Sequence, residues 1–163
     1  MPTRISATID PARSLTEART DDGHRIVLDA VPPEGDAAAP RPKETLLAAL
    51  AGCTGMDVVS ILRKKRQPAA SYEIIVSGES AAEHPKVFTT ISVEHVVTGA
   101  VEPEALRRSI ELSATRYCPV NAMLSATATI EHRYRLTAED GSTFEALVAV
   151  TGPGGTEVAA TGA

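Results

Sequence analysis

The sequence predicts an α+β fold in which a mainly antiparallel sheet packs the helices on one face. Two observations lead to this prediction. Several segments alternate apolar and polar residues with the period of a strand, and two others space their apolar residues as a helix does. Along the chain the order is strands, a long helix, two strands, a second helix and a last strand. Apolar residues make up 43% of the 163 residues, which suffices for a sizeable core.

The N-terminal part is expected to form a hairpin or a meander of short strands. Residues 4–9 have the composition of a short strand, and residues 24–31 have that of a longer one. The turn sequence Asp-Asp-Gly at 21–23 precedes the second strand. A loop rich in proline, glycine and alanine follows it at 32–42.

Residues 44–66 are expected to form one long helix. Pro42 suits the first helical turn, and Glu44 suits the positive end of the helix dipole. Apolar residues occupy most of the circumference of this helix, and a helix of that kind is buried. The basic run at 63–66 is typical of a helix C-terminus, where cations complement the dipole, rather than of a nucleic-acid site.

The second half of the chain is expected to complete the sheet. Alternating apolar residues predict strands at 71–80 and 86–98, joined by a hairpin connection. An amphipathic helix begins near Pro103, and Pro119 ends it or begins a short following helix. The last expected strand covers residues 126–136.

The chain is interpreted as one domain at 1–138 and a flexible C-terminal tail at 139–163, where glycine, alanine and threonine are frequent.

The net charge of −5 argues against nucleic acid as the main partner, because phosphate binding needs a basic face. The N-terminus has no apolar segment of a secretory signal. The longest apolar stretch, 46–62, is interrupted by polar residues and too short to span a bilayer comfortably. We therefore expect a cytoplasmic protein without a membrane partner.

The two cysteines are the candidate chemical groups. Cys53 lies in the middle of the long helix between small residues, and Asp57 follows one turn later on the same face. Cys118 directly precedes Pro119, so it can occupy an N-cap position, where backbone N–H groups favour a thiolate. The alternative is that both are ordinary buried thiols, since cysteine is among the most buried residue types.

Other sites are not marked by the sequence. The four histidines are scattered, and no C-x-x-C pair exists, so no metal site is predicted. No glycine-rich phosphate loop or nucleophilic serine elbow is present, and no cofactor is expected. A Cys–His hydrolytic pair stays open, although no spacing points to one.

Two motifs resemble those of the OsmC/Ohr family, named for osmotic induction and organic hydroperoxide resistance. The first is PKETLLAALAGCT at 42–54, which is similar to the core-helix motif of the family. The second is YCPV at 117–120, similar to the second cysteine motif, and the likeness extends over residues 4–136. The resemblance implies an intertwined homodimer in which the sheets wrap around long central helices. It also implies a thiol-dependent peroxidase that acts on hydroperoxides.

The resemblance further implies roles for individual residues. Cys53 would attack the peroxide and become a sulfenic acid, Cys118 would condense with it to a disulfide, and an external dithiol would reduce the pair. The family adds an arginine from the N-terminal strands, for which Arg13 is preferred to Arg19. It also adds a glutamate at the helix start, for which Glu44 is the candidate. The family position aligns with Lys43, and ideal helix geometry places Glu44 opposite Cys53.

Two further hypotheses use the same scaffold. The first is a binding protein that holds an apolar small molecule while the cysteines stay reduced and idle. The second is a redox sensor or structural thiol pair without turnover.

Overall fold

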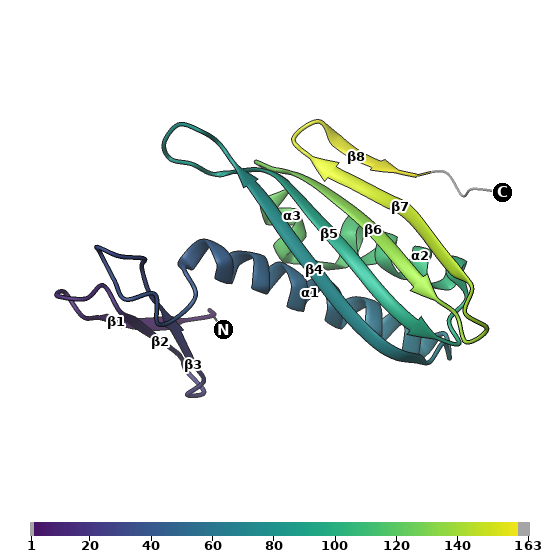
Figure 1. The fold of residues 1–163 in the computed structure, drawn as a ribbon, viewed down its shortest axis with the longest axis horizontal. Coiled ribbons are helices and arrows are strands. Elements are labelled where there is room, and N and C mark those ends of the chain that lie inside the picture. Colours follow the sequence, from purple (N-terminus) through teal and green to yellow (C-terminus); the bar gives the residue numbers. More distant parts are fainter. Residues whose placement is uncertain (1, 160–163) are drawn as a thin grey trace. The chain divides into compact units, whose positions relative to one another are not determined.

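The computed structural model describes residues 2–159, which divide into two compact units between residues 46 and 47 (Figure 1). The first unit is a small antiparallel sheet in the order β1 (Ile5–Ile9), β2 (Thr16–Thr20) and β3 (Arg25–Leu28). The meander predicted for this part is therefore present. Strand β2 is not marked in the sequence, because its residues TEART are mostly polar and only Ala18 is buried.

The second unit is a sheet of five strands with helices on one face, as Figure 1 shows. The sheet runs in chain order, and neighbouring strands are antiparallel except for the pair β5 and β6. Its strands are β4 (Ala69–Ser80), β5 (Phe88–Gly99), β6 (Thr129–Thr137), β7 (Thr143–Gly152) and β8 (Gly155–Val158). The predicted α+β class with a mainly antiparallel sheet is confirmed.

The parallel pair β5 and β6 needs a crossover, and helical segments supply it. They are α2 (Pro103–Leu112), a π-helical turn η1 (Ser113–Tyr117) and α3 (Pro119–Leu124). Proline stands at the first positions of both α2 and α3, where its missing N–H group leaves no helical hydrogen bond unmade. The crossover carries Cys118 across the helical face of the sheet.

The long helix α1 (Pro42–Lys64) lies along the sheet from residue 47 onward (Figure 1). Four of its residues are buried at helical spacing: Leu50, Thr54, Val58 and Leu62. In the single chain burial is confined to this stripe, because the sheet covers only one side of the helix, and Met56 is 76% exposed. By length and composition the helix could also cross a membrane, a property that the core helices of other proteins share.

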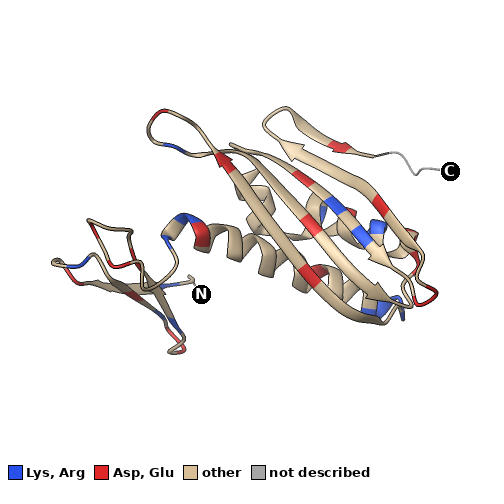
Figure 2. Ribbon diagram, viewed as in Figure 1, with Lys and Arg blue, Asp and Glu red and all other residues tan. Residues whose placement is uncertain are grey.

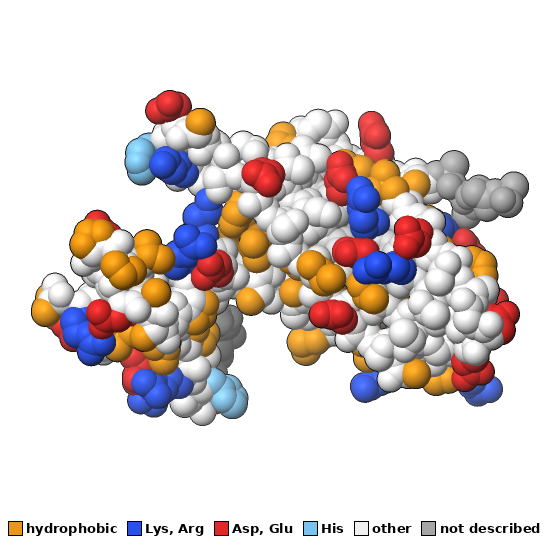
Figure 3. Space-filling model, in the orientation of Figure 1, with side chains coloured by type: hydrophobic (Ala, Val, Ile, Leu, Met, Phe, Trp, Pro, Cys, Tyr) orange, Lys and Arg blue, Asp and Glu red, His pale blue; other side chains and the backbone are white. Residues whose placement is uncertain are grey.

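The core of the second unit forms between the helices and the inner side of the sheet. One cluster gathers around Val58, Leu62, Leu106 and Ile110, and a second around Leu50 and Cys118. The strands of the sheet carry charged residues of both signs (Figure 2). In the space-filling view the two signs are interspersed (Figure 3), and ion pairs such as Arg135–Glu94 join neighbouring strands.

The C-terminal region differs from the flexible tail expected at 139–163. Residues 143–158 form β7 and β8, and β7 pairs with β6 along its length. Val148 and Ala149 are fully buried in the core. Small residues such as alanine and threonine make a weak strand pattern, and pairing with β6 supplies the stability that this pattern lacks. Residues 160–163 of the expected tail lie outside the described residues.

Candidate active site

The two cysteines come together in the core of the second unit. Cys53 stands in the middle of α1, and Cys118 lies between η1 and α3. Their sulfur atoms are within 4.8 Å of each other, and both are free thiols. The structure thus joins the two residues that the sequence analysis singled out, although they are far apart in the chain.

Cys118 is the N-cap of α3, the position expected from Pro119. Its side chain is 3% exposed. Its Sγ accepts hydrogen bonds from the backbone N–H of Asn121 at 3.3 Å and from the hydroxyl of Thr54 at 3.5 Å. These donors hold the sulfur toward α1 and complement a negative charge on it.

Cys53 is half-buried and faces less favourable electrostatics. Burial raises the pKa of its thiol to about 11, and the neighbouring Cys118 and Asp57 add to the rise. A hydrogen bond from the backbone N–H of Val120 acts in the opposite direction. A thiolate at Cys53 near neutral pH therefore needs a positive charge beside it.

Asp57 lies one helical turn after Cys53, as its spacing predicts, and completes a triangle with the two sulfurs. One of its carboxylate oxygens is within 4.8 Å of each sulfur atom. The hydroxyl of Ser113, in the π-helical turn, donates a hydrogen bond to Asp57 Oδ2 at 3.0 Å. The site therefore contains two thiols and a carboxylate, of which Cys53 and Asp57 lie on α1 and Cys118 at the start of α3.

A buried polar chain begins behind Cys118 at Asn121, which is 1% exposed. Its side-chain amide donates to the carbonyl oxygen of Ala114 at 2.8 Å and to Thr151 Oγ1 at 3.1 Å. The amide oxygen of Asn121 is then left to accept from Nε2 of His132 at 2.9 Å. This contact assigns the proton of neutral His132 to Nε2 and leaves Nδ1 as an acceptor.

The chain continues across the sheet to Tyr72. Nε2 of His95 lies 3.4 Å from Nδ1 of His132, so His95 donates through Nε2. The hydroxyl of Tyr72 then donates to Nδ1 of His95 at 2.6 Å. Burial lowers the pKa of His132 to about 4, and burial together with repulsion from His132 lowers the pKa of His95 well below 6.5. Both imidazoles are thus neutral near neutral pH, as the donor pattern requires.

In the sequence these histidines are scattered, and their spacing predicts no site. The available signal was their place in the strand alternation, since His95 follows Ile91 and Val93 on the inward side of β5. His132 likewise lies on the same inward side of β6 as Ile130, two residues before it. A histidine in an inward position needs buried partners, and these are the partners described above.

Comparison with known proteins identifies the family. The family model for OsmC-like proteins matches residues 34–133. The chain is 40% identical to protein YhfA of Escherichia coli strain K12 over 117 residues, which cover 71% of this chain and 85% of YhfA. The chain belongs to the OsmC family.

Solved structures of similar proteins share the OsmC fold. A hypothetical protein from Aquifex aeolicus is similar with a TM-score of 0.75 and 27% identity, over 85% of this chain and 98% of that one. The organic hydroperoxide resistance protein OhrB of Bacillus subtilis is similar with a TM-score of 0.57 and 18% identity. That likeness covers 82% of this chain and 98% of OhrB and supports the fold alone.

The residues that the OsmC resemblance adds to the cysteines lie in the first unit. The exposed side chain of Arg13 forms an ion pair with Asp36, and that of Arg19 pairs with Glu17. Glu44 accepts a hydrogen bond from the backbone N–H of Arg41 at 2.9 Å and also pairs with its guanidinium. Each of these groups is thus engaged with a neighbour in its own unit, and their roles at the thiols stay predictions.

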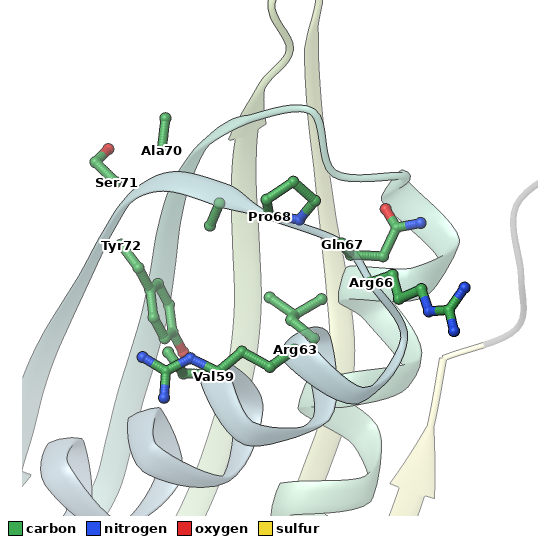
Figure 4. Close-up of a pocket in the computed structure, with 10 residues that line it drawn as sticks. Val59, Arg63, Arg66, Gln67, Pro68, Ala70, Ser71 and Tyr72 are labelled. Atoms are coloured by element: carbon green, nitrogen blue, oxygen red, sulfur yellow. The ribbon is translucent and has the colours of Figure 1, made fainter.

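The groove in Figure 4 is a separate feature of this OsmC protein. It measures about 560 Å³ and lies where α1 ends and β4 begins, with Arg63, Arg66 and Tyr72 on its walls. Neither cysteine lines it. The two thiols therefore lie outside this groove.

Proposed function

We propose that this OsmC-family protein is a thiol peroxidase that reduces organic hydroperoxides or hydrogen peroxide with Cys53 and Cys118. The observation that carries the proposal is the approach of the two free thiols to within 4.8 Å. OhrB of Bacillus subtilis, an organic hydroperoxide resistance protein, shares the fold, and we choose hydroperoxides as the substrate class by analogy with it.

The proposed reaction proceeds in two steps. The Cys53 thiolate attacks one oxygen of the peroxide, the O–O bond breaks, and the leaving alkoxide takes up a proton to become an alcohol. The sulfenic acid at Cys53 is then attacked by the Cys118 thiolate, and hydroxide leaves with a proton as water. An external dithiol exchanges with the resulting disulfide and is itself oxidised, which returns both thiols.

The first step needs a cation beside Cys53, because burial holds the pKa of that thiol at about 11. By resemblance to the family we assign this role to Arg13, with Arg19 as the second candidate. Glu44 would orient the guanidinium. Attraction between a guanidinium and the sulfur would lower the thiol pKa and allow a thiolate near neutral pH.

The alternative function is a binding protein for an apolar small molecule. The raised pKa of Cys53 favours it, because a protonated thiol reacts slowly with peroxide. The pairing of Glu44 with Arg41 also favours it, since that carboxylate is already engaged. In this case the cysteines would stay reduced.

A homodimer belongs to the proposal as the partner of each chain, and the protein is proposed to act in the cytoplasm. The outward side of α1 supports a dimer, because Met56 exposes 76% of its surface there, and exposed apolar surface of this kind is commonly buried in an interface with another protein.

Light scattering on the eluted peak of a sizing column should give the mass of a dimer. Met56→Glu should shift it to a monomer, whereas Met123→Glu, on the exposed side of α3, should not. A monomeric wild-type protein would contradict the dimer.

Mass spectrometry of the reduced protein after one equivalent of cumene hydroperoxide tests the peroxidase. A loss of about 2 Da together with the loss of both alkylatable thiols would show the Cys53–Cys118 disulfide. Cys53→Ser should abolish peroxide consumption, and Cys118→Ser should stop at a sulfenic acid that dimedone traps. Two alkylatable thiols after prolonged exposure would instead support the binding protein.

A further inference from the structure

Three atoms at the thiol site have the identity and spacing of metal ligands. Cys53 Sγ, Cys118 Sγ and a carboxylate oxygen of Asp57 all lie within 4.8 Å of one another. In a tetrahedral site with Zn–S distances of about 2.3 Å, neighbouring ligand atoms are about 3.7 Å apart. Side-chain adjustments of about an ångström would therefore bring all three onto one ion.

Hydrogen bonds around these atoms form the outer shell that such ligands require. Asn121 N–H and the Thr54 hydroxyl both donate to the sulfur of Cys118. The Ser113 hydroxyl donates to Asp57 Oδ2 and leaves the other carboxylate oxygen available. Donors of this kind fix the direction of a ligand atom and stabilise its anionic form, and they are usual around bound metal ions.

The three ligands come from α1 and from the start of α3, and the core holds both in place. Cys53 and Asp57 are one turn apart on α1, so they face the same side of the helix. Cys118 is held by its N-cap position at α3 and by the core that packs around it, where its side chain is 3% exposed. Cys53 is the more accessible of the two cysteines, so an ion can approach the site from its side.

We propose that the reduced protein binds one thiophilic divalent cation, with Zn²⁺ as the best match, through Cys53, Cys118 and Asp57. Two thiolates select zinc over hard cations such as magnesium and calcium, which prefer oxygen ligands. Water or a small thiol completes the tetrahedron. Binding replaces two thiol protons by the ion, so each zinc taken up releases two protons to solvent.

The spacing of cysteines and histidines in the sequence predicts no metal site. Cys53 and Cys118 do not form a C-x-x-C pair, and only the crossover between β5 and β6 brings them together. The inference goes beyond the proposed peroxidase and needs only reduced thiols. If both hold, zinc and peroxide compete for the same sulfurs, because a disulfide offers no thiolate to a metal.

Cobalt titration of untagged, reduced and metal-free protein under anaerobic conditions tests the proposal. We expect one cobalt ion per chain, with an intense thiolate-to-cobalt absorption band and the visible bands of a tetrahedral ion. Added zinc should displace the cobalt and bleach the bands, while a weakly buffered solution should acidify by two protons per zinc.

Variants assign the ligands. Cys53→Ser and Cys118→Ser should each reduce the thiolate band by about half, and Asp57→Asn should weaken cobalt binding about tenfold or more. Asp140→Asn, in the exposed turn before β7, is the matched control and should bind as the wild type does. Alkylation of both thiols in the unmutated protein should abolish the band.

The contrary results are equally definite. Absence of a thiolate band in the wild type would overturn the proposal, as would equal affinity of the wild type and Asp57→Asn. Cobalt uptake that survives alkylation would show an adventitious surface site only. A protein that forms no disulfide with peroxide but gives the thiolate band loses the peroxidase function and keeps the metal site, and the reverse pattern separates them equally well.

Discussion

His95 donates a hydrogen bond from Nε2 to Nδ1 of His132, at an N···N distance of 3.4 Å, across the parallel strands β5 and β6. Both rings are fully buried. The contacts of His95 with Tyr72 and of His132 with Asn121 determine which group donates in each hydrogen bond of this buried chain of hydrogen bonds. Because no buried side-chain nitrogen or oxygen among residues 2–159 lacks a partner, loss of one member leaves its neighbours unsatisfied.

His132→Leu should therefore destabilise the protein by about 3 kcal/mol. The substitution removes a donor to Asn121 and an acceptor for His95, and leucine supplies neither. Urea unfolding followed by circular dichroism measures the change in free energy of unfolding. His24→Leu is the control, because the His24 side chain is 81% exposed and should change stability little. Equal effects of the two substitutions would contradict a structural role for the chain.

Stability should fall with decreasing pH between about 6.5 and 4. The unfolded chain protonates its histidines near the ordinary pKa of 6.5, whereas folded His132 protonates only near 4. The unfolded state therefore binds more protons in this interval. For His132 alone this lowers the free energy of unfolding by about 3 kcal/mol as the pH falls through the interval. His95 acts in the same direction, since its pKa is also lowered.

The interval separates this effect from that of the carboxylates. Asp29, whose pKa is lowered by backbone hydrogen bonds from Ala38 and Ala30, loses its contribution only at lower pH. Urea unfolding at several pH values should show the slope in the wild type and a much weaker slope in His132→Leu. A wild-type stability that is constant from pH 6.5 to 4.5 would refute the buried neutral pair.

Parts of the site follow from local rules of sequence. The 3.6-residue period places Asp57 beside Cys53, and Pro119 makes Cys118 an N-cap. That Cys53 and Cys118 lie together was predicted only from the family resemblance. The tertiary path of the crossover brings them together, and no local spacing in the sequence indicates that path. The contact of His95 with His132 likewise depends on the parallel register of β5 and β6, in which Val93 stands beside His132. No local pattern encodes that register.

The C-terminal strands show the limit of composition as a guide. Glycine, alanine and threonine predicted a flexible region after residue 138, yet β7 buries Val148 and Ala149. Val148→Ala should therefore cost about 2 kcal/mol, since the lost methyl groups leave a cavity in a closed core. Leu147→Ala is the matched control on the opposite face of the same strand, where the side chain is 42% exposed. Thermal unfolding that is equally unaffected in both variants would favour the flexible tail.

Asn121 should control the second step of the proposed peroxidase cycle and leave the first unchanged. Its side chain ties the start of α3 to the carbonyl of Ala114 and to Thr151, and this holds the N–H that contacts the Cys118 sulfur. Asn121→Ala would loosen α3 and misalign Cys118 with the sulfenic acid, so disulfide closure should slow about tenfold. Met123→Ala, on the exposed side of α3, is the control.

Stopped-flow measurements separate the two steps for this prediction. Consumption of the first equivalent of peroxide reports on Cys53, and the later appearance of the disulfide, by alkylation of quenched samples, reports on Cys118. In Asn121→Ala the first rate should match the wild type while the second falls. If both rates fall together, the substitution acts through general loss of structure, and the positioning role is wrong. If neither falls, the backbone N–H alone holds Cys118, because the N-cap contact survives without the side chain.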